Sequence, residues 1–572
     1  MVEHTDRRLI ICCDGTNNTL TAGAKDTNVL RLYNHIKHVG NPDYILYYDP
    51  GVGSPDSVPP TGLIDWAKRY AERIGGLASG QGIYTNIAEA YLFLMRNWRN
   101  DEDRIYLFGF SRGAFTARAV AGMVNLFGLL RPEHEPLLPT LIHVYFSQPS
   151  NSGSKWTKVV GRMHASGARP GKAAAEVAGH TEDSVVDGKL SPDREHLAKQ
   201  IEELFVGDDR KATVQWIGVW DTVESVGLPG PLSRSNPATA TLAGKRMRNV
   251  RHALSLDEHR WAFEPRIYEE PGDLNANGQT LKQRWFPGVH CDIGGSYQQS
   301  ESGISNRSLA WMISELATDL KIPSVARLEA GPLLRHDPLY DTPWWALAGM
   351  SLRNVAPKIA GHKSFLSIED DGGTPAMPSA SVWTTPRSWK TLAIALVLGS
   401  VFLLLSGACA LNPHDFNSYG PIRAISHAGE LAVTQAVGLP SFDRYINGWR
   451  IAPGAPAWAM FWDLLFLGCI GYLLARVSSR AYAWLAGQRR ATSGMPKWRF
   501  LGFAPLVAIG ADVTEDVLTL LSLTIQAAGG DLLGYALLCL VALCSWFKFI
   551  GWILCLPLLL VRMAIFFSSR TF

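Results

Sequence analysis

The feature that most constrains this chain of 572 residues is a change in polarity near residue 388. Before that point, short apolar segments alternate with helical patterns and with charged residues. After it, long apolar runs predominate, and the first of them, Thr391 to Leu411, contains no charged residue. A run of this length and composition can cross a bilayer as one helix. The sequence therefore predicts a globular domain over residues 1–350, a linker over residues 351–388 and a membrane domain over residues 389–572.

The predicted membrane domain contains further apolar segments. A second candidate span covers Ala457 to Ala475, where Asp463 is the only charged residue and should face protein rather than lipid. Residues 501–567 are apolar but interrupted by charged residues and a proline: Asp512, Glu515, Asp516, Lys548, Pro557 and Arg562. We expect a broken or re-entrant segment there, followed by one span with an interfacial tail, and about four transmembrane helices in all. The alternative is a set of helices buried in a large soluble domain.

Basic residues suggest an orientation for these spans. The predicted loop 476–499 carries a cluster of them: Arg476, Arg480, Arg489, Arg490, Lys497 and Arg499. The positive-inside rule places such a loop in the cytoplasm. Two spans separate it from the N-terminal domain, which is therefore expected on the same side. Arg562 and Arg570 favour the same side for the C-terminal end, which requires an even number of spans.

Composition excludes several classes of protein. The formal net charge is only +3 and the basic residues of the first half are scattered, which argues against a nucleic-acid partner. The cysteines show no zinc-binding spacing and no disulfide framework, so we expect no metal and no cofactor. The apolar segment Leu9 to Cys13 is too short for a secretory signal and is followed directly by Asp14.

The first half of the chain has the pattern of an α/β protein. Leu9 to Cys13, Tyr44 to Tyr48 and Arg104 to Phe108 are predicted as short buried strands, and Asn86 to Trp98 has the apolar spacing of a helix. Strands that alternate with helices form mostly parallel sheets. The continuous apolar run Val214 to Trp220 suits a strand that is buried on both faces.

Ser111 lies in the sequence Gly109-Phe110-Ser111-Arg112-Gly113, between a predicted strand and a helix rich in small residues. A nucleophile elbow needs glycines at these two positions, because the strand turns abruptly into a helix and a Cβ atom would collide with neighbouring backbone. The pattern therefore predicts a nucleophilic serine. A polar residue in an ordinary glycine turn is the alternative.

A serine nucleophile requires a base and an acid that orients the base. Asp221 directly follows the predicted strand Val214 to Trp220, and His290 follows a second apolar run, in the chain order of α/β-hydrolases. We predict Ser111, Asp221 and His290 as a catalytic triad. Asp292, two residues beyond the histidine, competes as the acid. A structural histidine is the alternative for His290.

The tetrahedral oxyanion of such a reaction needs backbone N–H donors. One is predicted at Arg112, directly after the nucleophile, and the second at Gly15 or Thr16, in the loop after the first strand. Asp14 in that loop could instead tie it down by accepting backbone hydrogen bonds. Residues 147–193, with little apolar periodicity, are predicted as a cap or as a disordered insertion.

Six blocks of this sequence resemble, in order, the DUF2235 family of bacterial α/β-hydrolases, which includes Tle1-type phospholipase effectors of type VI secretion. The blocks are RRLIICCDGTNN, YYDPGVGS, GFSRGAFTAR, GVWDTVESVG, HALSLDEHRWAFEP and WFPGVHCDIGGSY. The resemblance covers roughly residues 7–346. It implies an α/β-hydrolase domain whose Ser-Asp-His triad falls on Ser111, Asp221 and His290, and the hydrolysis of lipid esters. Ser296 stands where the family usually has a third glycine.

These observations together predict a membrane-anchored serine hydrolase of lipid esters, a phospholipase in the first place. Its expected location is the bacterial inner membrane, with the N-terminal domain in the cytoplasm unless the chain is delivered to another cell as an effector. A secretion adaptor or an immunity protein remains open as a partner. The alternative is a membrane pore or channel with an inactive hydrolase-like domain, because Asp463, Asp512, Glu515 and Asp516 lie within or between apolar segments.

Overall fold

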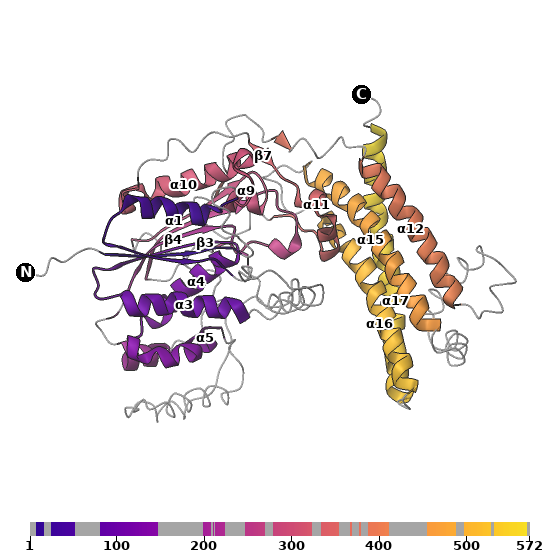
Figure 1. Ribbon diagram of the computed structural model, residues 1–572, viewed down its shortest axis with the longest axis horizontal. Coiled ribbons are helices and arrows are strands. Elements are labelled where there is room, and N and C mark those ends of the chain that lie inside the picture. Colours follow the sequence, from indigo (N-terminus) through magenta and orange to yellow (C-terminus); the bar gives the residue numbers. More distant parts are fainter. Residues whose placement is uncertain are drawn as a thin grey trace, which may run out of the picture. The chain divides into compact units, whose positions relative to one another are not determined.

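The computed structural model describes residues 7–15, 25–51, 81–146, 198–206, 210, 212–223, 246–268, 278–322, 333–353, 366–368, 377–378, 387–410, 455–487, 497–527 and 531–568 (Figure 1). The chain forms two compact units. The first comprises Met1–Asp257, Phe263–Arg335 and Lys358–Met377, and the second comprises Glu258–Ala262, His336–Pro357 and Pro378–Phe572.

The first unit is built on a seven-stranded sheet in the order β2-β1-β3-β4-β5-β6-β8. Its strands are β1 (Arg8–Cys13), β2 (Tyr44–Asp49), β3 (Arg104–Phe110), β4 (Val214–Trp220), β5 (Met247–Ser255), β6 (Thr280–Phe286) and β8 (Leu366–Ile368). Every neighbouring pair in this sheet is parallel. The predicted α/β architecture with a mostly parallel sheet is therefore confirmed for this unit. A two-stranded sheet, β7 (Leu334–Arg335) with β9 (Met377–Pro378), lies outside it.

Helices cover both faces of the sheet (Figure 1). On one face lie α1 (Asn28–Val39) and α10 (Gly303–Leu320), and on the other lie α3 (Gln81–Asn97), α4 (Arg112–Phe127) and α5 (Leu138–Phe146). Alternate residues of β1 enter different cores: Leu9, Ile11 and Cys13 pack with α3 and α4, whereas Ile10 and Cys12 pack with α1 and α10. Burial on both faces explains why these strands appear in the sequence as continuous apolar runs.

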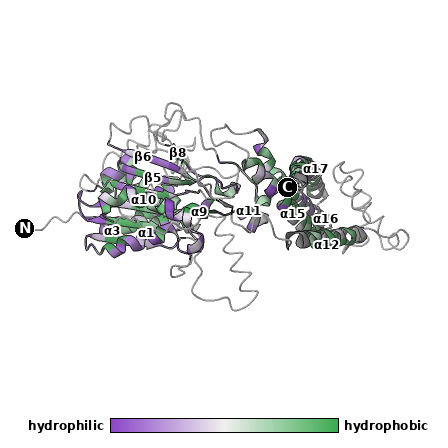
Figure 2. Cartoon of the chain, turned by 90° about the horizontal axis from the view of Figure 1, so that it is seen from above, coloured by the Kyte–Doolittle hydropathy of each residue, from purple (hydrophilic) through white to green (hydrophobic). Residues whose placement is uncertain are grey.

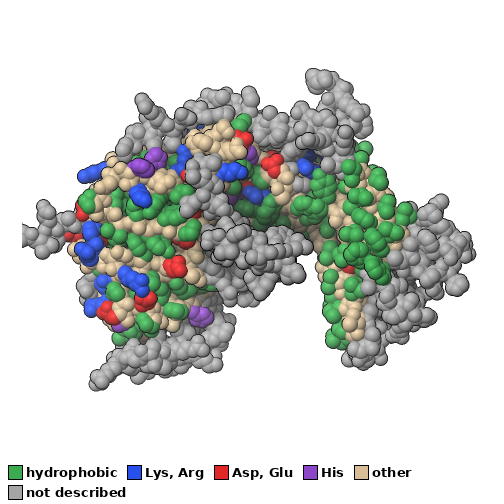
Figure 3. All heavy atoms as spheres, in the orientation of Figure 1, with side chains coloured by type: hydrophobic (Ala, Val, Ile, Leu, Met, Phe, Trp, Pro, Cys, Tyr) green, Lys and Arg blue, Asp and Glu red, His purple; other side chains and the backbone are tan. Residues whose placement is uncertain are grey.

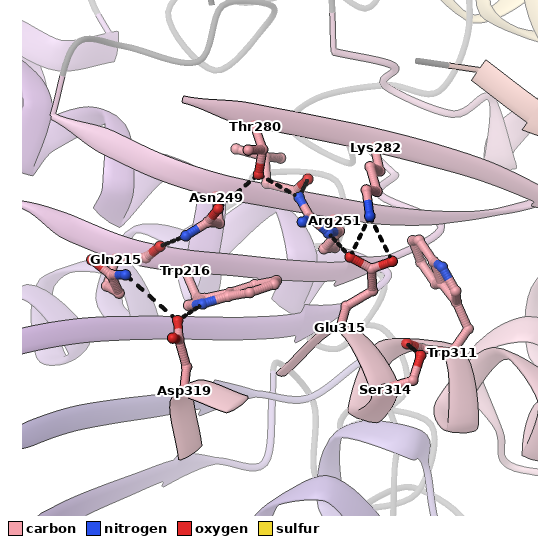
Figure 4. Close-up of polar contacts among 11 residues, drawn as sticks. Gln215, Trp216, Asn249, Arg251, Thr280, Lys282, Trp311, Ser314, Glu315 and Asp319 are labelled. Carbon is pink, nitrogen blue, oxygen red and sulfur yellow. Dashed lines mark hydrogen bonds and ion pairs between the residues drawn. The ribbon is translucent and has the colours of Figure 1, made fainter. Parts of the chain in front are cut away.

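Polar contacts fix the second half of α10 over the strands (Figure 4). Glu315 accepts hydrogen bonds from Arg251 of β5 at 2.7 Å and from Lys282 of β6 at 2.8 Å. One turn further along the helix, Asp319 accepts a hydrogen bond from the indole of Trp216 on β4. These contacts attach one helix to three neighbouring strands, and therefore stabilise the order of the strands that carry the candidate site.

The boundary between the units differs from the predicted linker over residues 351–388. Within that segment, β8 pairs in parallel with β6 and completes the main sheet. The first unit includes Phe263–Arg335 and Lys358–Met377, and the segment His336–Pro357 between them belongs to the second unit. A three-residue strand is too short to be recognised from periodicity, so the return of this segment to the sheet could not be predicted.

The second unit is helical. It contains α11 (Pro338–Asp341), η9 (Pro343–Ala348), α12 (Arg387–Ala410), α15 (Ala455–Gly487), η10 (Lys497–Phe503), α16 (Ala504–Ala527) and α17 (Asp531–Ser568). Apolar residues predominate along α12, α15, α16 and α17 (Figure 2). Many of these side chains are exposed, among them Ile394, Trp458, Leu543, Ile553 and Leu560, and together they give the helices an apolar surface (Figure 3).

Two helical segments of this unit are long and apolar enough to cross a membrane, Trp458–Ala486 and Cys539–Ile565. The apolar segment of α12, Ala393–Ser406, is shorter. Two consecutive helical segments, Arg112–Phe127 and Pro132–Phe146, are also long and apolar enough when taken together, but they pack in the core of the first unit. The count of four transmembrane helices therefore remains a prediction. Since α15 continues to Gly487, Arg476 and Arg480 belong to a helix and not to the loop predicted for residues 476–499.

The carboxylates expected to break the helix near residue 512 do not do so. Helix α16 is continuous from Ala504 to Ala527, because the ammonium group of Lys548 on α17 lies 2.9 Å from Asp512 and 2.8 Å from Glu515. Neutralisation by a neighbouring helix makes burial of these carboxylates tolerable. The hydropathy pattern along α16 cannot show that its carboxylates are paired with a lysine on α17.

This ion cluster leads to a stability prediction. Lys548→Met should lower the free energy of unfolding of the helical unit by about 3 kcal/mol, because two buried carboxylates lose their counter-ion. Thermal unfolding in detergent, followed by far-UV circular dichroism, measures the effect. The triple variant Lys548→Met, Asp512→Asn, Glu515→Gln should regain most of the loss. A single variant as stable as the wild type would contradict the assignment.

Candidate active site

The candidate site lies at the carboxyl ends of β3, β4, β5 and β6, which are consecutive neighbours in the sheet. Phe110, Trp220 and Ala253 are aligned across β3, β4 and β5. The residues that follow the first two are Ser111 and Asp221, and His290 begins the short helix α9 (His290–Gly294) after β6. Because parallel strands end at the same edge, residues far apart in the sequence are brought to this edge of the sheet.

Ser111 stands in a strained turn between β3 and α4. Its φ is 58° and its ψ is −121°, a conformation that is uncommon for a residue with a side chain. The turn is held by the Ser111 N–H, which donates to the Trp220 carbonyl at 3.0 Å. A Cβ atom on Gly109 would collide with backbone of α4, and one on Gly113 would collide with the carbonyls of Cys13 and Asp14. The two glycines are therefore required by the geometry of an elbow.

Asp221 repeats this arrangement on the next strand. It follows β4 with a φ of 38°, and its N–H donates to the Ala253 carbonyl at 2.7 Å. The side chain is completely buried. Its Oδ1 accepts a hydrogen bond from the Ser255 N–H at 3.0 Å, and its Oδ2 accepts one from the Ser255 hydroxyl at 2.9 Å. Both oxygens of this buried carboxylate are thus hydrogen-bonded, as buried polar groups require.

His290 is joined to Asp221 by a short hydrogen bond. The distance between His290 Nδ1 and Asp221 Oδ2 is 2.6 Å, and the imidazole is buried. The rings of Phe110 and Phe263 pack against the imidazole, with centroid distances of 4.6 and 4.9 Å. Aromatic faces exclude water and favour a cation next to them. With Nδ1 engaged by the carboxylate, the imidazole has Nε2 as its second polar atom.

Asp292, the competing acid, has a different contact. Its Oδ2 accepts a hydrogen bond from the Val289 N–H at 3.0 Å, at the start of α9. This is the usual task of a carboxylate in the first turn of a helix. The structure therefore pairs His290 with Asp221 and uses Asp292 to cap the helix that carries the histidine.

The family comparison agrees with this fold. A model of the catalytic domain of Tle1-like phospholipase effectors of type VI secretion matches residues 7–315, more than half of the chain. The chain belongs to this family. Membership in the Tle1-like family suggests a lipid-hydrolysing function.

A relative outside bacteria also matches. "Uncharacterized protein YEL023C" of Saccharomyces cerevisiae is 29% identical over 262 residues, which cover 45% of this chain and 32% of the yeast protein. The chain thus spans about a third of the length of that relative. The printed name of this relative gives no activity.

The loop after β1 is fixed by Asp14. Its Oδ1 accepts a hydrogen bond from the Gly15 N–H at 2.7 Å, and its Oδ2 accepts hydrogen bonds from Thr27 Oγ1 at 2.6 Å and Tyr48 Oη at 2.7 Å. Burial and the adjacent Asp14 carboxylate raise the pKa of Tyr48, so the phenol stays protonated and donates. Asp14 thus has the structural contacts of a loop anchor. Thr16 lies outside the described residues.

Arg112 is the first residue of α4 and is buried. Its backbone belongs to the helix N-terminus directly after Ser111, where N–H groups and the helix dipole favour a negative charge.

Residues 147–193, predicted as a cap or insertion, lie outside the described residues. Within the described segments, no cluster of His, Cys, Asp and Glu side chains has the arrangement of a metal site.

Sequence reasoning missed Ser255, the last residue of β5. It contacts both oxygens of Asp221 and is fully buried. One signal could have identified it: like Ser111 and Asp221, it is a polar residue at the end of an apolar strand in one of the six blocks of the Tle1-like family. Nothing along the chain indicated that β5 lies between the strands that carry the acid and the histidine.

The elbow geometry gives a second testable prediction. Gly113→Ala should lower the free energy of unfolding by about 1–3 kcal/mol, because the added methyl group forces α4 away from the carbonyls at the end of β1. Thermal denaturation of the purified chain provides the measurement. Gly468→Ala is the matched control, because an added Cβ there meets nothing within 4 Å in the middle of α15. Equal stability of the two variants would show that the elbow has room for a side chain.

Proposed function

We propose that the first unit is a serine hydrolase that cleaves carboxylic esters of lipids, a phospholipase, with Ser111, His290 and Asp221 as its triad. The observation that carries the proposal is the 2.6 Å hydrogen bond between His290 and Asp221, at the sheet edge where Ser111 occupies a strained elbow. A buried imidazole held by a buried carboxylate is suited to general base catalysis. Family membership supports lipid as the substrate.

In the proposed mechanism, Ser111 Oγ attacks the ester carbonyl while His290 Nε2 accepts its proton. Asp221 fixes the imidazole with Nδ1–H towards the carboxylate and stabilises the imidazolium. The imidazolium then protonates the leaving alcohol, and an acyl-enzyme on Ser111 remains. Water, deprotonated by His290, then attacks this ester, and the imidazolium returns the proton to Ser111 Oγ as the fatty acid leaves. The rings of Phe110 and Phe263 limit the access of bulk water to the imidazole.

The oxyanion is proposed to accept hydrogen bonds from two backbone N–H groups. The Arg112 N–H, at the start of α4, is the first donor. Of the two candidates in the loop after β1, Gly15 already donates to Asp14. The second donor is proposed at Gly15 or Thr16, the latter outside the described residues, with Asp14 as the residue that holds the loop in place.

The helical unit is proposed to anchor the hydrolase to the bilayer that contains its substrate. The apolar segments Trp458–Ala486 and Cys539–Ile565 are long enough to insert. In our proposal the N-terminal domain faces the cytoplasm, either of the producing cell or of a cell into which the effector is delivered, and an adaptor or immunity protein could act as a partner. A pore is the competing function, but the pairing of Lys548 with Asp512 and Glu515 gives two of the buried carboxylates a packing role.

The test compares the wild type, Ser111→Ala and Ser314→Ala on phospholipid vesicles and short-chain esters. Turnover should fall roughly 10⁴-fold or more in Ser111→Ala, because the acyl-enzyme can no longer form on Ser111. Ser314→Ala removes a hydroxyl on the exposed face of α10 and should leave the rate unchanged. Equal turnover in all three proteins would refute the serine mechanism. Bilayer conductance that persists in Ser111→Ala, without any hydrolysis by the wild type, would favour the pore.

A further inference from the structure

The order of strands poses a geometric problem for the acid. Strand β5 lies between β4, which Asp221 follows, and β6, which precedes His290. The carboxylate of Asp221 must therefore reach across the end of β5 to contact the imidazole. Ala253 of β5 is aligned with Trp220, and Ser255 is aligned with Phe286 at the end of β6. The side chains of Asp221 and His290 therefore meet over Ser255, a small residue at the end of β5.

Ser255 holds both oxygens of the carboxylate. Its N–H lies 3.0 Å from Oδ1 and its Oγ lies 2.9 Å from Oδ2, while His290 Nδ1 lies 2.6 Å from the same Oδ2. Two donors from one residue fix the plane of the carboxylate, and the shared oxygen is directed at the imidazole. All three side chains are buried, so water contributes little to this orientation.

We propose that Ser255 is a positioning residue for the catalytic acid, an inference that rests on the proposed serine mechanism. Its hydroxyl directs Asp221 Oδ2 towards His290 Nδ1 and withdraws electron density from that oxygen. The first effect aligns the base with Ser111. The second limits how strongly the carboxylate attracts the imidazolium that forms during the reaction.

The backbone supports this assignment. Asp221 has a φ of 38°, a conformation that disfavours a residue with a side chain unless the surroundings hold it. The Asp221 N–H is bonded to the Ala253 carbonyl, and its carboxylate is bonded to Ser255. Two residues of β5 therefore fix Asp221 at both its backbone and its side chain. A strained residue that is held in this way can keep its side chain in one orientation through the reaction.

The hydroxyl has consequences that a purely structural role would lack. In Ser255→Ala the backbone N–H still holds Oδ1, so the fold should persist. Oδ2 loses one donor, becomes more basic and binds the imidazolium more strongly. We expect kcat to fall roughly 10-fold with little change in KM, because alignment matters in the transition state and not in substrate binding. The acidic limb of the pH profile of kcat/KM should move to higher pH. Ser255→Thr, which keeps the hydroxyl, should retain the wild-type profile.

A double-mutant cycle tests whether Ser255 acts through Asp221. The four proteins are the wild type, Ser255→Ala, Asp221→Asn and the double variant, assayed on the same ester over a range of pH. If the inference holds, Ser255→Ala has little further effect once Asp221 is replaced. Tyr44→Phe is the matched control: it also deletes a buried hydroxyl hydrogen bond, to the Leu320 carbonyl, but at the opposite end of the strands. It should leave both the pH profile and kcat unchanged.

The outcomes separate the two proposals. Two results would overturn the role of Ser255 and leave the triad intact. In the first, hydrolysis requires Ser111 but is unaffected by Ser255→Ala. In the second, Ser255→Ala has equal effects with and without Asp221. An absence of hydrolysis by the wild-type chain would overturn the triad, and the role of Ser255 with it. If circular dichroism shows that Ser255→Ala does not fold, the test passes to Ser255→Thr. The proposal requires this variant to fold and to retain the wild-type pH profile. A displaced acidic limb in Ser255→Thr would refute the proposal.

Discussion

The arrangement of the candidate site depends on one constraint, the parallel direction of β3, β4, β5 and β6. Parallel strands deliver their carboxyl ends to a single edge, and the register aligns Phe110 with Trp220 and Trp220 with Ala253. Ser111 and Asp221, which directly follow Phe110 and Trp220, are then placed side by side. Parallel neighbours need crossover connections, and α4 lies in the one between β3 and β4, while the polar contacts of Glu315 and Asp319 keep α10 in place over β4, β5 and β6. The short hydrogen bond between His290 and Asp221 follows from that order.

Two residues of this edge are held in conformations that cost free energy. Ser111 and Asp221 both have positive φ values directly after a strand, and both backbones are bonded to the neighbouring strand. Such strain costs about 1–3 kcal/mol at each position and persists only when the surrounding packing enforces it. At Ser111 the absence of side chains at Gly109 and Gly113 makes the turn possible. At Asp221 the end of β5 provides the support.

Much of the first unit could be predicted from the sequence because its signals are local. The buried strands are continuous apolar runs, and the elbow has its own glycine pattern. The choice between Asp221 and Asp292 could not be made in this way, since it depends on which carboxylate a folded chain brings to His290. Ser255 was missed for the same reason. In the second unit, Asp512 and Glu515 looked like helix breaks until a partner on another helix, Lys548, was taken into account. Strand β8 was too short to give a signal, although it completes the sheet.

The central claim is that His290, held by Asp221, activates the hydroxyl of Ser111. Labelling with a fluorophosphonate, followed by mass spectrometry of peptides, tests this claim most directly, because the reagent reacts with activated serines. The account predicts one adduct, on Ser111, and a labelling rate that falls by orders of magnitude in His290→Ala. An adduct on another residue, or labelling of Ser111 at the same rate without His290, would contradict it.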